Sequence, residues 1–473
     1  MTTSCLLIEA NIIQKSSNIS ISASVFKFEK KIQINETIWY PFIFEKYIYY
    51  RIDTSDNKPE HEMTKRFEIQ YDNLIKDNKY SLKLGIASHN FRLFNINNLN
   101  YGIGGQSLGC NNHKEFLNTT NIKYIDYHNN ELNKFIDSRK YDINNLSGEK
   151  IYSPNIVCPY YGNGLHLFLF SNIDKNAYVE LNRGLPILSG IIDGRYDGHY
   201  GHHKGMNSGL SVYDSNTSIL YNYTNKQYFL YQRSNIGTGV RYIQYSTSSD
   251  LIKWSSFKLI KMNPPVDYFR TNIYYNNFFK IAGISNYIGI LPCNKKINNS
   301  YSGLDEKETF QLYYSNDCEN WNYIGTMNEH KYYVYWMVCG EPILHDNKYV
   351  FYMNNDVEKT LEIYTIEKNR FSYSIPIESD KIGTMYFKLI HINDSQIKLN
   401  FKTFEQGYIK IQLRNINNDI IDGYSFNEFN IINDNMNEME YAISWASSNT
   451  NINEKDVYIE IEGKNYSIYS IMC

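Results

Sequence analysis

Residues 193–254 read DGRYDGHYGHHKGMNSGLSVYDSNTSILYNYTNKQYFLYQRSNIGTGVRYIQYSTSSDLIKW, and this stretch decides the fold. It begins as a loop of Gly, His, Asp and Tyr. It continues as short runs in which polar and apolar residues alternate, separated by turn residues such as those at 224–226. Alternation with a period of two is typical of half-buried β-strands. A polar loop that leads into several short strands indicates one blade of a β-propeller, with the loop near the propeller axis.

Similar strand units recur along the chain. Short units at such spacing favour a propeller over a single sandwich, and five units predict five blades. The units span residues 67–94, 151–172, 205–254, 272–321 and 340–373.

Two of the units share a turn motif. The segments 245–254 and 313–321 each contain an Asp four residues before a Trp, and residues 87–94 form a degenerate copy without the Asp. An Asp in such a turn accepts hydrogen bonds from backbone N–H groups, so we predict a structural role for Asp250 and Asp317. The Trp of each motif is expected to pack between neighbouring blades.

The composition changes along the chain and predicts three parts. Residues 1–40 alternate and are expected to form an edge strand or a small cap. Residues 41–375 are expected to form the five-bladed propeller, with the Asn-rich insert near 101–150 over one face. Residues 376–473 carry several alternating strands with Gly and Asn turns, which predict a C-terminal β-sandwich.

The overall composition limits the classes of partner. The 473 residues are 42% hydrophobic and 21% charged, which is typical of a globular protein in water. The net charge of -3 argues against a nucleic-acid partner. The seven cysteines form no CxxC pair, which disfavours a zinc site and favours reduced thiols. With no signal peptide and no apolar stretch long enough to cross a bilayer, we expect no membrane partner and a cytoplasmic or particle-associated protein.

Several segments resemble the five-bladed propellers of glycoside hydrolase families 32 and 43. These are SPNI…GNGLHLFLF, MNSGLSVYD…YFLYQRSN, GVRYIQYSTSSDLIKW and YYSNDCENW, and the tail from LNFKT to YSIYSI is similar to the C-terminal sandwich of family 32. The resemblance covers roughly residues 67–473. It implies an axial sugar pocket and hydrolysis by a pair of carboxylates without a cofactor or a metal. Where those families place an Asp at the start of a unit, this chain has Asn155 and Asn207, and Arg-Asp-Pro is absent.

Three carboxylates are candidates for catalysis. Glycoside hydrolysis needs two carboxyl groups across the bond that breaks, one protonated and one ionised. Glu341 follows the apolar run YVYWMVCG, so burial there would raise its pKa and suit it as the acid. Asp193 and Asp197 flank Gly-Arg-Tyr and are candidates for the nucleophile or base. For all three, a structural or turn-forming role remains an alternative.

Other residues are candidates for contacts with a sugar. The cluster His-x-x-His-His is able to bind a metal or sugar hydroxyls, and we favour sugar because no matching metal ligands accompany it. Arg241 follows a Gly-Thr-Gly turn at the start of a strand and is expected to face a carboxylate or a substrate oxygen. Tyr faces near the axis would stack on sugar rings. The predicted substrate-binding set is Arg241, His199, His202, His203, Asn207, Asn155 and Tyr275.

Two hypotheses about function follow. The first is a glycoside hydrolase that acts on a glycan in the axial pocket. The second is a catalytically inactive propeller that binds a glycan or serves as a structural component of a particle surface. A pair of carboxylates within about 5–10 Å of each other would favour the first. A pocket lined by Asn, Tyr and His without such a pair would favour the second.

Overall fold

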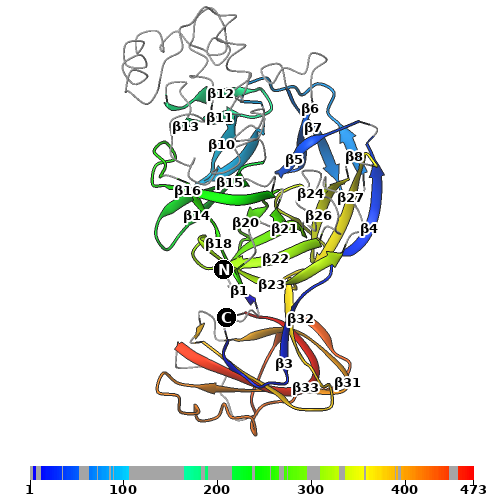
Figure 1. Cartoon of the computed structure of the whole chain (residues 1–473). Coiled ribbons are helices and arrows are strands. Elements are labelled where there is room, and N and C mark those ends of the chain that lie inside the picture. The colour runs from blue at the N-terminus through cyan, green and yellow to red at the C-terminus, as the bar shows by residue number, and fades with distance from the viewer. Residues whose placement is uncertain are drawn as a thin grey trace, which may run out of the picture.

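The computed structural model describes most of the chain, and the elements in the part it describes are all β-strands. The described residues are 4–6, 12–34, 36–52, 63–71, 73–84, 87–88, 90–105, 164–182, 187–189, 216–236, 240–255, 257–265, 271–273, 275–295, 309–329, 336–355, 358–388, 390–392, 396–446 and 456–472. Five sheets form a ring in the upper part of Figure 1, and a sixth group of strands lies below them.

The first two blades are built from the N-terminal part of the ring. In blade 1 the strand order is β5-β6-β7-β8, and in blade 2 it is β9-β10-β11-β12, with β13 paired to β11. The strands of blade 1 are β5 (Trp39–Phe44), β6 (Tyr47–Ile52), β7 (Met63–Gln70) and β8 (Asn73–Lys76). Those of blade 2 are β9 (Arg92–Ile96), β10 (Leu99–Gly104), β11 (Gly164–Asn172), β12 (Ala177–Glu180) and β13 (Leu188–Ser189).

Blades 3 and 4 follow in the middle of the chain. Blade 3 has the order β14-β15-β16-β17, and blade 4 has the order β19-β21-β22-β23-β18, with β20 paired to β21. The strands of blade 3 are β14 (Ser218–Asn222), β15 (Gln227–Ile236), β16 (Val240–Ser248) and β17 (Lys258–Leu259). Those of blade 4 are β18 (Lys261–Asn263), β19 (Thr271–Ile273), β20 (Phe278–Phe279), β21 (Tyr287–Lys295), β22 (Thr309–Ser315) and β23 (Asn320–Glu329).

Blade 5 combines the end of the propeller sequence with a strand from the N-terminal segment. Its order is β24-β26-β27-β4, with β25 paired to β26. The strands are β24 (Trp336–Val338), β25 (Ile343–His345), β26 (Lys348–Asn355), β27 (Thr360–Glu367) and β4 (Lys27–Gln33). In β4, Ile32 pairs with Leu361 and Lys31 with Glu362. Figure 1 shows this dark-blue strand alongside β27 at the edge of the ring, so the chain closes the ring with a strand from its beginning.

Each pair of adjacent blades shares its own apolar cluster. Phe42 and Phe91 pack between blades 1 and 2, and Tyr231 and Trp321 pack between blades 3 and 4. Further clusters join blades 2 and 3, 4 and 5, and 5 and 1. Neighbouring blades cover both faces of a central strand, so both faces of such a strand are buried and its sequence has few exposed polar positions. In β26, for example, the last seven residues are all buried. The five shared clusters therefore close a five-bladed propeller.

The two Asp-Trp motifs have the structural role that the sequence predicts. Asp250 Oδ1 accepts hydrogen bonds from the backbone N–H groups of Ile252 and Lys253 at 2.9 and 2.8 Å. Asp317 Oδ1 accepts equivalent bonds at 2.9 and 2.8 Å from the second and third residues after it. Trp321 is fully buried between blades 3 and 4. The turn role of both Asp residues is therefore confirmed.

The strands below the ring form the C-terminal β-sandwich. The central path runs β2-β29-β33-β28-β3, while β1, β30 and β31 also pair with β33 and β32 pairs with β31. Three N-terminal strands, β1 (Ser4–Leu6), β2 (Ile12–Lys15) and β3 (Ile19–Ala23), thus belong to this sheet system. The others are β28 (Ser372–Pro376), β29 (Gly383–Phe387), β30 (Ile390–His391), β31 (Lys398–Arg414), β32 (Asn437–Ala442) and β33 (Asp456–Met472).

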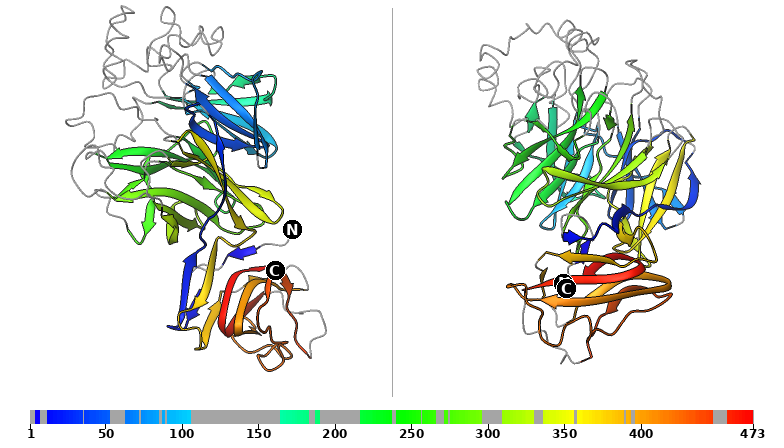
Figure 2. Two further views of the ribbon diagram at one scale, coloured as in Figure 1. Left: turned by 90° about the vertical axis from the view of Figure 1, so that its right-hand side faces the viewer. Right: turned by 60° about the horizontal axis from the view of Figure 1, so that its bottom comes forward.

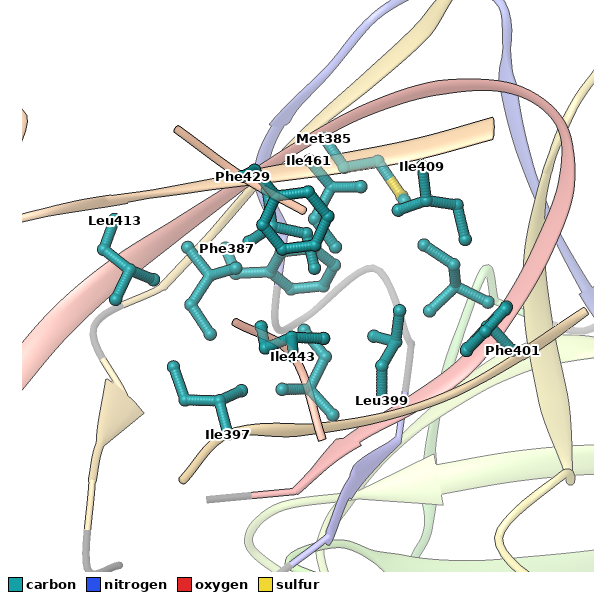
Figure 3. Packing of buried hydrophobic residues seen from close by; sticks show 14 of the residues in the cluster. Met385, Phe387, Ile397, Leu399, Phe401, Ile409, Leu413, Phe429, Ile443 and Ile461 are labelled. Atoms are coloured by element: carbon teal, nitrogen blue, oxygen red, sulfur yellow. The ribbon is translucent and has the colours of Figure 1, made fainter. Parts of the chain in front are cut away.

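A single apolar cluster fills the sandwich. Figure 3 shows Phe387 of β29, Leu399 and Phe401 of β31 and Ile461 of β33 gathered in one cluster. Inward residues alternate with outward ones in β33, where Val457, Ile459 and Ile461 are all fully buried. This alternation is what the sequence of the C-terminal part predicts, and the two views of Figure 2 show the sandwich as a separate body beside the propeller.

The number of blades agrees with the sequence prediction, but the position of the first unit does not. Residues 67–94 do not form one blade: they contribute β7 and β8 to blade 1 and the start of β9 to blade 2. The degenerate copy at 87–94 is therefore the start of an inner strand. Strands that belong to different blades carry the same kind of alternating sequence, so alternation alone does not mark the boundary between blades. The predicted division into three domains stays a prediction.

Candidate functional site

The innermost strand is divided in blades 4 and 5, where β19 and β20 both pair with β21, and β24 and β25 both pair with β26. Tyr40 and Asn90 have φ angles of 48° and 56°, and Gly340 has a φ of 90°. In blades 3 and 4, Asn216 and Asn276 exchange hydrogen bonds, each Nδ2 donating to the other backbone carbonyl at 2.7 and 2.6 Å. The reciprocal bonds of Asn216 and Asn276 join blades 3 and 4 just before their inner strands.

Hydrogen bonds also connect neighbouring blades beside their inner strands. Asn277 Nδ2 of blade 4 donates to the carbonyl of Gly340 in blade 5 at 3.2 Å. The backbone N–H of Ile43 in blade 1 donates to the carbonyl of Cys339 in blade 5 at 2.7 Å. Arg92 of blade 2 donates from Nη1 to Ser218 Oγ of blade 3 at 3.0 Å. The bonds hold the side chains of the axis in fixed positions.

A cavity of about 730 Å³ runs along the axis. Residues from the inner strand of every blade, or from the turns beside it, line the cavity, so it is the axial cavity that a propeller site requires. Its charged lining residues in the described part of the chain are Glu45, Arg92, Lys280 and Glu341. We call this space the axial cavity.

Glu341 lies between β24 and β25, where the inner strand of blade 5 is broken. The residue is exposed at the axial cavity, while many protein atoms surround its carboxyl group. These surrounding atoms remove water from the carboxyl and raise its pKa, and the nearby Arg92 guanidinium partly opposes the increase. A carboxyl group in this setting holds its proton to a higher pH than an exposed glutamate.

Arg92 spans the centre of the propeller. Only 8% of the residue is exposed. Nη1 donates to the Thr217 carbonyl at 3.3 Å and to Ser218 Oγ in blade 3, while a Cβ added to Gly340 in blade 5 would lie 3.1 Å from Nη2. Burial lowers the pKa of Arg92 and Glu341 opposes this, but a guanidinium stays charged in proteins. The side chain therefore places a fixed positive charge at the axis.

Lys280 is the second cation that lines the axial cavity. Its Nζ donates to the carbonyls of Ser285 and Asn286 at 2.5 and 3.2 Å and lies 4.7 Å from the centre of the Tyr287 ring. Burial lowers the pKa of Lys280 to about 8. Within the described residues, no carboxylate forms an ion pair with it. A second cavity of about 580 Å³ between the propeller and the sandwich also contains Lys280 and Glu341 in its wall.

Aromatic residues lie where the inner strands of blades 2 and 3 end. Phe94, Tyr221 and Tyr223 line the axial cavity, and Tyr223 is 68% exposed. The rings of Tyr221 and Tyr223 meet edge to face at 5.1 Å between centroids. An exposed ring with one apolar face and a polar edge suits contact with a sugar.

Two of the predicted substrate-binding residues are described, and neither lines the axial cavity. Arg241 is the second residue of β16, the third strand of blade 3, and its backbone N–H donates to Asn272 Oδ1 at 2.8 Å. Tyr275 is 5% exposed and packs edge to face on Tyr40 at 6.1 Å. The lining of the axial cavity therefore gives no support to a direct contact between either side chain and a ligand there.

The remaining candidates lie outside the described residues, and Glu341 is the one predicted catalytic residue that the structure describes at the axis. The strand that follows Asn155, β11, is the third strand of its blade, so the reason for expecting this Asn at an inner strand does not hold. The candidates outside the described residues are Asp193, Asp197, His199, His202, His203, Asn207 and Asn155.

Sequence reasoning did not select several residues that the structure brings to the axis. Asn90, Asn216 and Asn276 stand at the starts of the inner strands, and Arg92 and Lys280 line the axial cavity. A signal for the asparagines was present, because each precedes a run of apolar or β-forming residues. This signal is hard to recognise because the predicted first unit, residues 67–94, does not coincide with a blade and because Asn is abundant throughout the chain. No cluster of three metal-ligand side chains occurs among the residues that the structure describes.

The strand pairing and the cavity define a five-bladed β-propeller with an axial cavity and a C-terminal β-sandwich. No helix in the described residues is long and apolar enough to cross a membrane. No protein-family model and no curated protein matches the chain.

Solved structures do match along most of the chain. An N-acetylgalactosamine deacetylase from F. plautii, in complex with blood group B trisaccharide, is 8% identical with a TM-score of 0.35 and covers 96% of this chain and 95% of its own. A glycoside hydrolase family 43 arabinoxylan arabinofuranohydrolase from Bacillus subtilis is 8% identical with a TM-score of 0.33, over 92% of this chain and 95% of its own.

A third match is the catalytic domain of a GH62 α-L-arabinofuranosidase from Coprinopsis cinerea. It is 8% identical with a TM-score of 0.37, over 75% of this chain and 98% of its own. Family 43 is one of the two that the sequence resembles. At TM-scores below 0.5 these likenesses carry no argument, and the fold assignment rests on the strand pairing.

Proposed function

We propose that this protein takes a glycan into the axial cavity and hydrolyses a glycosidic bond there, with Glu341 as the general acid. The observation that supports this most directly is the Glu341 carboxyl, which faces a cavity of about 730 Å³ and whose pKa burial raises. A general acid must hold its proton at working pH and give it to the oxygen of the leaving sugar.

The proposed reaction needs a second carboxylate. Water adds across the bond between the anomeric carbon and the glycosidic oxygen: the oxygen takes the proton of Glu341, and the anomeric carbon receives a hydroxyl group. We propose Asp193 or Asp197 as the nucleophile or base, because both precede the inner strand of blade 3 in the sequence. The exposed ring of Tyr223 supports a sugar-binding role for the cavity.

A second candidate function is glycan binding without hydrolysis. The observation in its favour is that, in the described part of the chain, no carboxylate other than the exposed Glu45 accompanies Glu341 in the lining of the axial cavity, where Asn95, Asn97 and Asn98 lie instead. An amide hydrogen-bonds a sugar hydroxyl, but it neither accepts a proton from water nor forms a glycosyl intermediate. A structural propeller on a particle surface would fit the same residues.

The decisive experiment compares Glu341→Gln with Glu45→Gln on a panel of oligosaccharides and aryl glycosides. Both glutamates line the axial cavity, but Glu45 is an exposed residue of the turn between β5 and β6. We expect the wild type to release sugar and Glu341→Gln to lose about 10²–10⁴ in kcat, while it still binds the glycan. Glu45→Gln is expected to stay within a few-fold of the wild type.

The outcomes separate the two functions. If wild type and variants release no sugar from any substrate, but the wild type binds glycans in a binding assay, the inactive glycan-binding propeller is supported. If Glu45→Gln loses activity and Glu341→Gln keeps it, the assignment of the acid is wrong. Asp193→Asn and Asp197→Asn test the second carboxylate, and undiminished activity of both would exclude them.

A further inference from the structure

The axial cavity contains two cations that have no ion pair within the described part of the chain. Arg92 has no carboxylate oxygen within 4.0 Å of its guanidinium there, and Lys280 donates only to two backbone carbonyls. Removing a charge from water without an opposite charge is costly, so a bound anion that pairs with these cations would offset part of that cost. Both line the same cavity.

The two carboxylates of the lining do not cancel these cations in the interior. Glu45 is exposed on the turn between β5 and β6, where water and salt screen its charge. Glu341 is also exposed, but the protein around its carboxyl raises its pKa, so that it is more readily neutral than an ordinary glutamate. The inner part of the axial cavity therefore favours a negatively charged group.

The geometry of Arg92 suits an oxyanion. Nη1 is occupied by the Thr217 carbonyl and Ser218 Oγ, whereas Nη2 has no hydrogen bond within the described residues and lies over Gly340, next to Glu341. A guanidinium held in this way presents its remaining N–H groups in a fixed plane, which matches the oxygens of a carboxylate or a sulfate ester. Lys280 adds a second positive charge to the lining of the same cavity.

From this arrangement we infer that the axial cavity selects glycans that carry an acidic group, a carboxylate or a sulfate ester, which pairs with Arg92 and Lys280. This inference rests on the proposed function, since it specifies the class of glycan that the cavity takes. In the bound state the sugar ring contacts the Tyr223 face at the end of the inner strand, and the acidic group lies toward Arg92. Glu341, when protonated, is neutral and does not repel the acidic group, and its proton stays available for the glycosidic oxygen.

A glycan array with matched members tests the inference on the full chain. Each neutral oligosaccharide is printed beside its uronic-acid analogue and its sulfated analogue. We expect at least tenfold stronger binding to the acidic or sulfated member of a pair, with the preference reduced at high salt. Preference for uronic acids alone identifies a carboxylate, and preference for sulfated sugars alone identifies a sulfate ester.

Matched variants show whether the two cations carry the preference. Lys280→Met and Arg92→Gln are expected to lose tenfold or more of the affinity for the acidic member and little for the neutral one. Lys175→Met removes an exposed lysine in blade 2 and is expected to change neither. Should Lys280→Met or Arg92→Gln fail to fold, Lys280→Arg and Arg92→Lys, which keep the charge, are expected to keep the preference.

The failures of the inference and of the proposed function look different. Equal binding of neutral and acidic members by the wild type overturns the charge selectivity and leaves glycan binding intact. A preference for acidic members that survives in Lys280→Met and Arg92→Gln places the recognition elsewhere and also overturns the inference. Binding to no glycan of any charge overturns both.

Discussion

Replacing Gly340 with alanine tests how firmly Arg92 is held against the backbone of blade 5. Gly340 has a φ of 90°, a region that residues with a Cβ rarely adopt, and this backbone strain costs about 1–2 kcal/mol. The new Cβ would also lie 3.1 Å from Arg92 Nη2. Because Nη1 is bonded to Thr217 and Ser218, the guanidinium has little freedom to move away.

The contact adds a second cost to the first. Displacing the guanidinium weakens charged hydrogen bonds, which are worth about 1.5–3 kcal/mol. We therefore expect Gly340→Ala to lower the free energy of unfolding by about 2.5–5 kcal/mol in total. Gly423→Ala is the matched control, since Gly423 has a φ of 81° and its added Cβ would meet nothing within 4 Å. It carries the strain alone and is expected to cost about 1–2 kcal/mol.

Urea denaturation followed by tryptophan fluorescence measures both variants against the wild type. The excess cost of Gly340→Ala is expected to shrink in an Arg92→Lys background, because lysine lacks the guanidinium that the methyl group meets. An equal loss of stability in Gly340→Ala and Gly423→Ala would refute the reasoning. In that case Arg92 is not clamped at the axis, and the anion site inferred from it loses its geometric basis.

Two further predictions concern stability. Hydrogen bonds from the following backbone N–H groups outweigh burial and hold the pKa of Asp317 below its usual value, so its contribution is present above pH 4 and lost as the pH falls. We expect Asp317→Asn to cost about 1 kcal/mol at neutral pH and less at pH 3, in denaturation curves at both pH values, and an equal cost would contradict this. Lys31 of β4 pairs with Glu362 at 3.1 Å and with Glu358 at 2.5 Å, so Lys31→Met, which leaves Glu362 buried without its cation, is expected to cost about 1–2 kcal/mol after allowance for its exposure. The exposed Lys27 is the control, and Lys27→Met is expected to be close to neutral.

Much of the propeller could be predicted from the sequence because its signals are local. The Asp-Trp motifs depend on contacts between Asp250 or Asp317 and N–H groups two and three residues away, so a short segment contains the whole interaction. Strand alternation likewise depends on neighbours in sequence. The partner of β4 gives no such signal, because its residues 27–33 pair with 360–365, more than three hundred positions away.

The candidate site was less predictable for the same reason. Glu341 has a local signal, a Gly-Glu-Pro sequence after an apolar run, and it does line the axial cavity. Arg92 and Lys280 come from blades 2 and 4, in segments that read as ordinary strand starts and ends. Only the closure of the ring brings them to the same cavity, and no spacing between residues in the sequence predicts that closure.

The position of β4 has a consequence for synthesis of the protein. Ribosomes make residues 27–33 long before residues 360–367, so β4 emerges early and must wait, as an open strand edge, for most of the protein to be translated. The unpaired N–H and C=O groups of such an edge are able to pair with strands of other nascent chains. Its sequence KFEKKIQ is rich in charge and mostly exposed even after folding, and such charges keep an unpaired edge soluble. The charges of β4 thus keep the strand that completes the ring soluble until its partner has been made.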